Sequence, residues 1–177
     1  MVVNRQRRVR VAVKPLEVFV ERVRQALGLP EHALTVCLVS DATIARMNRI
    51  FRGKRGPTDV LSFPANGRFL AQGGGEVANQ GGRTAETRRA QRTQRNGNAA
   101  KGFSSASFAS SDSYLGDVAI SPETARRNAR RCARTLPEEL RILILHGALH
   151  LAGYDHESDH GEMDRLERRL RRALGLS

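Results

Sequence analysis

The sequence has no tryptophan and few other aromatic residues, with two tyrosines and six phenylalanines among 177 residues. Proteins that read single-stranded RNA by stacking successive bases depend on exposed aromatic side chains. This chain has little material for such a surface. If it binds a nucleic acid, we expect contacts to phosphates rather than repeated stacking on bases.

Cysteines and long apolar runs are also scarce. Cys37 and Cys132 lie far apart and form no C-x-x-C pair, which excludes a disulfide framework and a cysteine zinc ribbon. The longest apolar run, 142–151, is interrupted by His146 and His150. The basic N-terminus lacks the apolar centre of a signal peptide. We therefore expect a reduced, cytoplasmic chain with no membrane segment.

Acidic residues are few relative to basic ones. There are 18 Asp and Glu against 30 Lys and Arg, which gives a net charge of +12. A charge of this size and sign is typical of proteins that handle polyanions, above all nucleic acids. Hydrophobic residues make up 40% of the chain, enough for a buried core in one domain.

One long segment lacks the aliphatic spacing of a helix or a strand. Residues 66–113 are rich in Gly, Ser, Gln, Asn and Arg, with tracts such as GGG and SSASFASSDS. Such a composition buries too little apolar surface to offset the entropy lost on folding. We predict a single domain over residues 1–177, interrupted by a disordered low-complexity insertion at 66–113.

The N-terminal part predicts alternating strands and helices. Val9, Val11 and Val13 alternate with other residues, as in a half-buried strand. The following elements are expected to be a helix from Pro15 to about Gly28, a strand at 34–39, a helix capped by Asp41, and a short strand at 60–64.

The C-terminal part predicts one strand and three helices. A strand at 115–120 leads to Ser121 as a helix cap, and Pro137 begins a helix that is apolar nearly all round. Asp159 and Glu162 resemble a capping box for the last helix. Because strands and helices do not alternate strictly, we predict an α+β fold, a small mixed β-sheet packed with about five helices.

Three histidines lie within eleven residues, in the sequence HGALHLAGYDH. His146 and His150 are four apart on the predicted core helix, so both project from one face. Gly153 can end this helix in the left-handed conformation, which lets His156 return toward the same point. Three imidazoles with an open fourth position are typical of catalytic zinc, although they also suit nickel or copper. We predict a metal site on this buried helix and the following loop.

The remaining two histidines are weaker candidates. His160 is a conceivable fourth ligand, but its place at the edge of the last helix favours a solvated or capping role. His32 has no histidine neighbours in the sequence, and we expect it on the surface.

The same histidine spacing occurs in metzincin proteases, whose general base is a glutamate directly after the first histidine. Here that position is Gly147, which cannot accept a proton. Together with the positive charge, this favours a phosphodiester substrate over a peptide. A zinc metalloprotease stays as one alternative. A non-catalytic rRNA-binding assembly factor with structural zinc is another.

The histidine motif, together with NRIFRGKRGPTDVLSFP and LGDVAIS, closely resembles the YbeY family of bacterial metal-dependent endoribonucleases. The resemblance covers both sides of the insertion, where the family usually has a much shorter link. It implies an α+β fold, one zinc ion held by His146, His150 and His156, and the family's motif arginine at Arg52. It also implies single-strand-specific cleavage in 16S rRNA 3′-end maturation and ribosome quality control. The implied partners are single-stranded RNA and the small ribosomal subunit.

Arg52 stands where a predicted helix gives way to a glycine-rich turn. Its planar guanidinium can clamp a phosphate beside the metal, and Lys54 and Arg55 extend the basic track. The arginines of 126–134 predict a second rRNA contact, since like charges on one helix repel each other unless a polyanion relieves them. A solvated role stays open for these side chains.

Overall fold

The computed structural model describes residues 1–65, 114–154 and 161–176, and the predicted insertion at 66–113 lies outside the described residues. The described part holds four strands and five helices, which confirms the predicted α+β fold. In chain order they are β1 (Val2–Asn4), α1 (Val13–Ala26), β2 (Leu34–Leu38), α2 (Asp41–Arg52), β3 (Val60–Pro64), β4 (Gly116–Ile120), α4 (Pro122–Arg131), α5 (Leu136–Leu151) and α6 (Glu162–Leu174).

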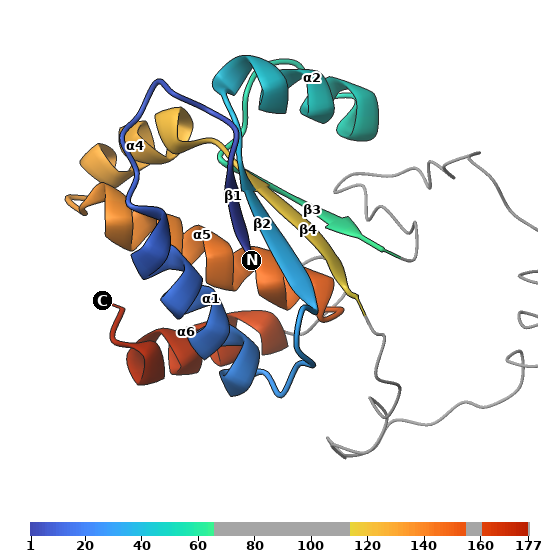
Figure 1. Cartoon of the computed structure of the whole chain (residues 1–177), viewed down its shortest axis with the longest axis vertical. Helices are drawn as coiled ribbons and strands as arrows, with labels where there is room; N and C mark the ends of the chain where they lie inside the picture. Colours follow the sequence, from blue (N-terminus) through green and yellow to red (C-terminus); the bar gives the residue numbers. More distant parts are fainter. Residues whose placement is uncertain (66–113, 155–160, 177) are drawn as a thin grey trace, which may run out of the picture.

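The sheet is small and mixed, as the sequence predicts. Its strand order is β1-β2-β4-β3. The first three strands are parallel, and β3 runs antiparallel to β4. Beyond the ends of this last pair, the Ala65 N–H donates to the Leu115 carbonyl at 2.8 Å. The two ends of the segment that contains the insertion therefore meet where β3 ends and β4 begins (Figure 1).

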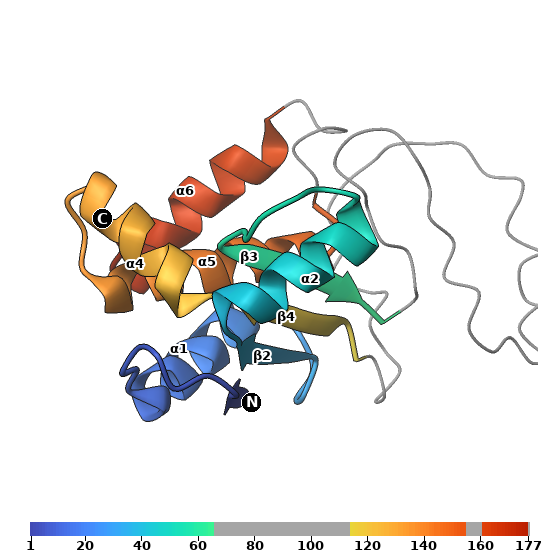
Figure 2. The ribbon, with the colours of Figure 1, turned by 90° about the horizontal axis from the view of Figure 1, so that it is seen from above.

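The sheet separates two hydrophobic clusters. The larger one joins α1, α5 and α6 to strand residues such as Val36 and Val118. The smaller one lies on the other face, where Ile44 of α2 packs with Leu61 and Ala119. The two views show α1, α5 and α6 gathered on one side of the strands, with α2 lying apart from them (Figures 1 and 2).

Helix α5 is the predicted core helix, buried nearly all round. Its Gly147 lies directly on the sheet, since a Cβ at this position would come within 2.6 Å of Val118 Cγ1. The Ser62 hydroxyl of β3 donates to the Gly147 carbonyl at 3.2 Å. No helix within the three described ranges combines the length and apolarity needed to cross a membrane.

The predicted strand at Val9, Val11 and Val13 is wrong. The first strand is β1, and Val13 already begins α1. Val9 is buried, but its backbone pairs with a side chain instead of a strand. The Gln6 amide accepts from the Val9 N–H and donates to the Val9 carbonyl, both at 2.9 Å. The alternating valines belong to a loop held by one glutamine.

Two predicted helix caps are also wrong. Ser40, not Asp41, caps α2, and its hydroxyl accepts from the Thr43 N–H at 3.3 Å. Helix α6 begins at Glu162 after Gly161, whose φ is 79°, so Glu162 is the first helical residue and not the third, as a capping box requires; Asp159, the predicted cap, lies outside the described residues. The predicted cap of α4 is confirmed, since Ser121 accepts from the Thr124 N–H at 3.3 Å.

Candidate metal centre

His146 and His150 lie on the same side of α5, half-buried on a helix that is otherwise mostly buried. Their Nε2 atoms are 3.1 Å apart. The ring centroids are 4.7 Å apart and the ring planes meet at 78°. The two imidazoles thus turn corresponding nitrogens toward one point, as the sequence predicts.

This pair fits the geometry of a metal site. Tetrahedral zinc with Zn–N bonds of about 2.0–2.1 Å holds neighbouring nitrogens about 3.3 Å apart. The Nε2 separation is close to that value, and neutral imidazole is a ligand that zinc prefers. His146 and His150 therefore suit two adjacent positions around one ion.

The other predicted ligands lie outside the described residues. His156, the predicted third ligand, and His160 both belong to 155–160. Among the residues that the structure describes, no three His, Cys, Asp or Glu side chains gather closely enough to hold a metal. The complete site stays a prediction. His32 is an exposed surface residue, as expected.

A buried carboxylate stands behind His146. Glu167 of α6 is only 5% exposed, and its Oε2 lies 3.1 Å from His146 Nδ1. When His146 donates its Nδ1–H to this oxygen, the Nε2 lone pair is left free for a metal. Arg171 in turn donates to Glu167 Oε1 from Nε at 3.1 Å and from Nη2 at 2.5 Å.

The charge of Glu167 is preserved by its partners. Burial raises the pKa of this carboxyl group, but the hydrogen bond with His146 and the Arg171 guanidinium outweigh burial and lower it. Glu167 therefore stays ionised at neutral pH. A fixed negative charge next to His146 favours a cation at the histidine pair.

The sequence analysis missed Glu167 and Arg171, although one signal was present. Met163, Leu170 and Leu174 form the buried face of α6, and Glu167 lies on the same face. A charged residue on the apolar stripe of a helix needs a buried partner. That pattern alone identifies Glu167, although not His146 as its partner.

Gly147 bears on the protease alternative. The residue after the first histidine faces Val118 of the sheet, where even a Cβ lacks space. A glutamate there would displace the strand before it could reach a substrate. The packing adds a steric reason to the chemical one against a metzincin base at this position.

Arg52 is the last residue of α2, as predicted, and its side chain is half-buried. Gly53 ends the helix with a φ of 65°, a conformation that favours glycine. Asn48 holds the basic turn beneath the helix end, because its carbonyl accepts from the Lys54 N–H and its amide donates to the Gly56 carbonyl. The backbone around Arg52 is therefore fixed.

Arg52 and the histidines are connected through strand β3. The ring of Phe51, next to Arg52, packs edge-on against Phe63 with centroids 5.1 Å apart. One residue away, Ser62 donates to Gly147, the neighbour of His146. Strand β3 thus separates the helix that carries Arg52 from the helix that carries the histidine pair. A role of Arg52 at the metal stays a prediction.

Comparison with known proteins decides the family. The profile described as Endoribonuclease YbeY matches residues 1–175. The chain belongs to the YbeY family. The resemblance found from the three sequence motifs is thereby confirmed.

Individual YbeY relatives match most of the chain. A protein from Koribacter versatilis is 34% identical over 99% of this chain and 86% of its own length. One from Aquifex aeolicus is 34% identical over 88% and 76%. Both are named Endoribonuclease YbeY. A solution structure from Thermotoga maritima shares the fold, with a TM-score of 0.53 and 23% identity over 98% of this chain and 89% of that one.

Proposed function

We propose that this YbeY family member is a metal-dependent endoribonuclease specific for single-stranded RNA. We assign it to 16S rRNA 3′-end maturation and ribosome quality control in the cytoplasm, with the small ribosomal subunit as partner. The relatives are named endoribonucleases, and a net charge of +12 suits an RNA substrate. The proposed cofactor is one Zn²⁺ per chain, held by His146, His150 and His156.

The observation that carries the proposal is the His146–His150 pair. Its two Nε2 atoms are 3.1 Å apart, and Glu167 lies behind one of the rings. A buried carboxylate behind an imidazole is the usual companion of a metal-binding histidine. A histidine pair serving only to fill the core would not need an ionised partner behind it.

Each residue has a distinct task in the proposed reaction. When bound, zinc supplies Lewis-acid polarisation of a phosphoryl oxygen and lowers the pKa of a coordinated water. His146 and His150 bind the ion, and Glu167 fixes the orientation of His146. Arg52 binds a phosphate oxygen of the RNA and stabilises the charge that develops there during cleavage.

The test is cleavage of a labelled single-stranded RNA by the purified chain, with and without chelator. We expect cleavage that the chelator abolishes and added zinc restores. His150→Ala should lose both the metal, measured by elemental analysis, and the activity. His32→Ala is the matched control, because His32 is exposed, and it should keep both. Full metal retention in His150→Ala contradicts the site.

Arg52→Ala separates phosphate binding from metal binding. We expect this variant to keep its zinc and its fold but to lose RNA cleavage, because the side chain is assigned to the substrate. Activity equal to that of the parent chain overturns this role. Metal and RNA binding without cleavage by the parent chain would instead favour the assembly-factor alternative, and cleavage of a peptide substrate would favour the protease.

A further inference from the structure

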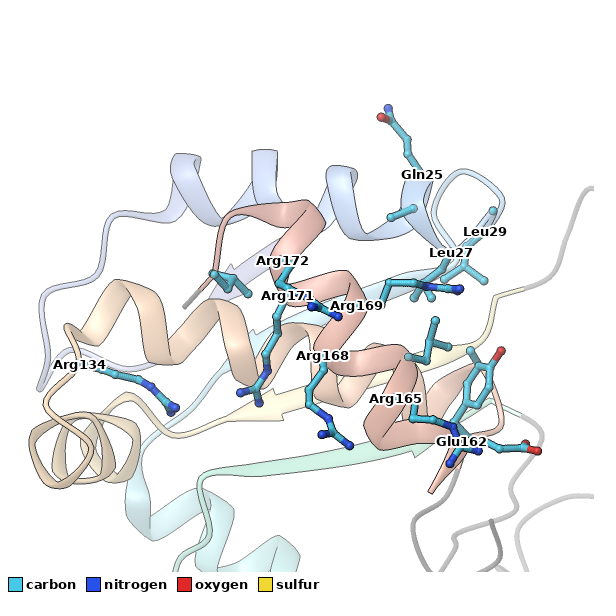
Figure 3. A pocket seen from close by; sticks show the side chains of 16 residues that line it. Gln25, Leu27, Leu29, Arg134, Glu162, Arg165, Arg168, Arg169, Arg171 and Arg172 are labelled. Atoms are coloured by element: carbon cyan, nitrogen blue, oxygen red, sulfur yellow. The ribbon is translucent and has the colours of Figure 1, made fainter. Parts of the chain in front are cut away.

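An arginine-lined groove runs along α6, and neither His146 nor His150 is among its lining residues. It has a volume of about 1670 Å³ and is lined by α6, the end of α1 with the residues that follow it, Arg134, and two residues after α5. Figure 3 shows the guanidinium groups of α6 spread along this groove, with Leu27 and Leu29 near one end. Its lining arginines are Arg134, Arg165, Arg168, Arg169, Arg171 and Arg172, and its only acidic lining residue among those described is Glu162.

Three of these arginines form no ion pair within the described ranges, although Arg168 Nε donates to the Asp164 carbonyl at 3.2 Å. Arg134 and Arg171 are paired with the buried Glu139 and Glu167. By contrast, Arg168, Arg169 and Arg172 are exposed and form no ion pair with any residue of the described ranges. The groove therefore presents at least three positive charges to a ligand.

Packing of α6 does not explain this arginine cluster. The helix is held by its opposite side, where Met163, Leu170 and Leu174 are buried. Arg168 and Arg172 are four residues apart, so their like charges repel each other and destabilise the helix slightly. A polyanion bound in the groove would attract both side chains and offset the repulsion between them.

The groove is joined to the candidate metal centre by one side chain. Arg171 lines the groove and also donates to Glu167, which contacts His146. Tyr154, another lining residue, lies four residues after His150. Only Glu167 stands between Arg171 and His146, so an RNA strand that extends beyond the histidines can reach the groove.

We propose that the α6 groove binds phosphates of single-stranded RNA on one side of the cleavage site, which makes it an extended substrate subsite. This inference rests on the proposed function. Guanidinium groups match phosphate in a bidentate manner, and along α6 they recur about once per helical turn, or every 5.4 Å or so. A phosphodiester chain carries a charge at every nucleotide, so it can meet such a row without a special sequence, whereas an acidic protein segment needs carboxylates at matching positions.

The test compares two variants that each lose three exposed arginines. The first is Arg168→Gln with Arg169→Gln and Arg172→Gln, in which glutamine keeps the helix propensity. The control is Arg5→Gln with Arg7→Gln and Arg10→Gln, whose side chains are exposed near the N-terminus. Both variants change the net charge equally, so a difference between them reports position. Circular dichroism melting verifies the fold of each.

Binding to single-stranded RNA is measured by fluorescence anisotropy across a salt series with zinc-loaded proteins that all carry Arg52→Ala, which is expected to keep the metal without cleaving, and gels verify that the RNA stays intact. The slope of log K against log salt is negative, and each lost phosphate contact reduces its magnitude by about 0.7 for single strands. The α6 variant, which loses three contacts, should therefore have a slope smaller in magnitude by about 2. Its affinity at low salt should fall roughly tenfold, with a higher KM and an unchanged kcat. The control should keep the parent slope.

Three results overturn the inference. In the first, the α6 variant keeps the salt dependence of the parent chain. In the second, both variants lose the same amount of salt dependence. In the third, poly-glutamate displaces labelled RNA from the parent chain at the same concentration as unlabelled RNA does. The last result assigns the groove to an acidic protein. If the parent chain cleaves RNA and the α6 variant binds RNA as tightly as the parent, the proposed subsite is wrong and the proposed function stands. If the parent chain binds RNA through α6 but does not cleave it, the proposed function is wrong and the RNA-binding groove stands.

Discussion

Helices α4 and α6 are a natural pair to compare. Both are short, both pack against the core helix α5, and both carry several exposed arginines. In the sequence they look alike, and only the arginines of the first were predicted to contact RNA. In the structure the two helices are attached to different partners, and the attachment in each case is made by an acidic residue.

Helix α4 is attached to the start of α2. The Glu123 carboxylate accepts from the Asp41 N–H at 2.8 Å. In return, the Asp41 carboxylate accepts from the hydroxyls of Ser121 and Thr124 at 2.5 and 2.7 Å. Each helix supplies an acid to the other's N-terminus, where the helix dipole favours negative charge. This contact stabilises the fold, and neither histidine takes part in it.

Helix α6 is attached to α5 through Glu167 and His146. Here the acid lies in the middle of the helix, on its buried side, and it touches a predicted ligand. The comparison teaches that the number of exposed arginines alone does not distinguish the two helices. The position of the acidic residue on each helix shows which of the two contacts a predicted metal ligand.

The largest expected effect comes from removing these two acids separately. Glu167→Ala should weaken zinc binding by about 10- to 100-fold, because His146 loses the group that orients it. Glu123→Ala should leave zinc affinity unchanged and lower only the thermal stability. Titration with a competing metal indicator measures both. If the two variants bind zinc equally well, the acidic residue of α6 matters no more for zinc binding than the acidic residue of α4. Glu167→Gln, which can still accept a hydrogen bond, should be intermediate.

A smaller effect is expected at Asp41. Asp41→Ala should cost about 1–2 kcal/mol of unfolding free energy, since the buried Ser121 hydroxyl loses its acceptor. Zinc affinity should stay unchanged. Urea unfolding measures the loss, with Glu162→Ala as control, because Glu162 is an exposed acid in the first turn of α6. A stability loss in the control as large as that of Asp41→Ala would remove the special role of this contact.

The Asp41 contact also has an expected pH dependence. Burial raises the pKa of Asp41, but hydrogen bonds from Ser121, Thr124 and Arg127 outweigh burial and lower it. The folded pKa thus lies below the unfolded value of about 3.9. The stabilisation is fully present above the unfolded pKa and is lost as pH falls through the folded one. The stability gap between the parent chain and Asp41→Asn should therefore shrink in acid. A gap that is constant down to about pH 2 contradicts this.

The smallest effect is expected from the arginines of α4. Among the described residues, none from α4 lines the α6 groove. Replacing Arg126, Arg130 and Arg131 with Gln should change the affinity for a short single strand less than about threefold, as expected for charges outside the binding site. On a long fragment of small-subunit rRNA the loss should be larger, if the predicted second contact exists. A short-strand loss equal to that of the α6 variant would make the two helices equivalent.

The sequence predicted elements best where local chemistry and packing agree. Strand β4 and helix α4 follow the sequence pattern closely, since Ser121 and Pro122 are strong local signals at a helix start. The strand predicted at 9–13 failed because alternation cannot tell a strand from a loop whose backbone bonds are made by the side chain of Gln6. Gln6 and Val9 are only three residues apart, but their contact is made by a side chain, and a period-two pattern of apolar residues does not register it.

The candidate site shows the same division. The spacing of His146 and His150 on one helix sufficed to predict that they meet, because helical geometry is local. Glu167 arrives from another helix, 17 residues after His150, so its contact depends on how α6 packs on α5. No spacing rule contains that information.

The hydrogen bond between Ala65 and Leu115 holds together the two ends of the intervening segment, so the chain could be cut between them into two fragments that still meet there. A cut between these residues would leave one fragment with β1, β2, β3 and Arg52, and another with β4 and the pair His146 and His150. Strand β4 of the second fragment would have to pair with both β2 and β3 of the first fragment to complete the sheet. Under the roles proposed for Arg52 and the histidines, neither half acts alone, so the two halves would form a split enzyme whose activity reports on the reunion of its fragments. Fused to two other proteins, they would work as an association sensor.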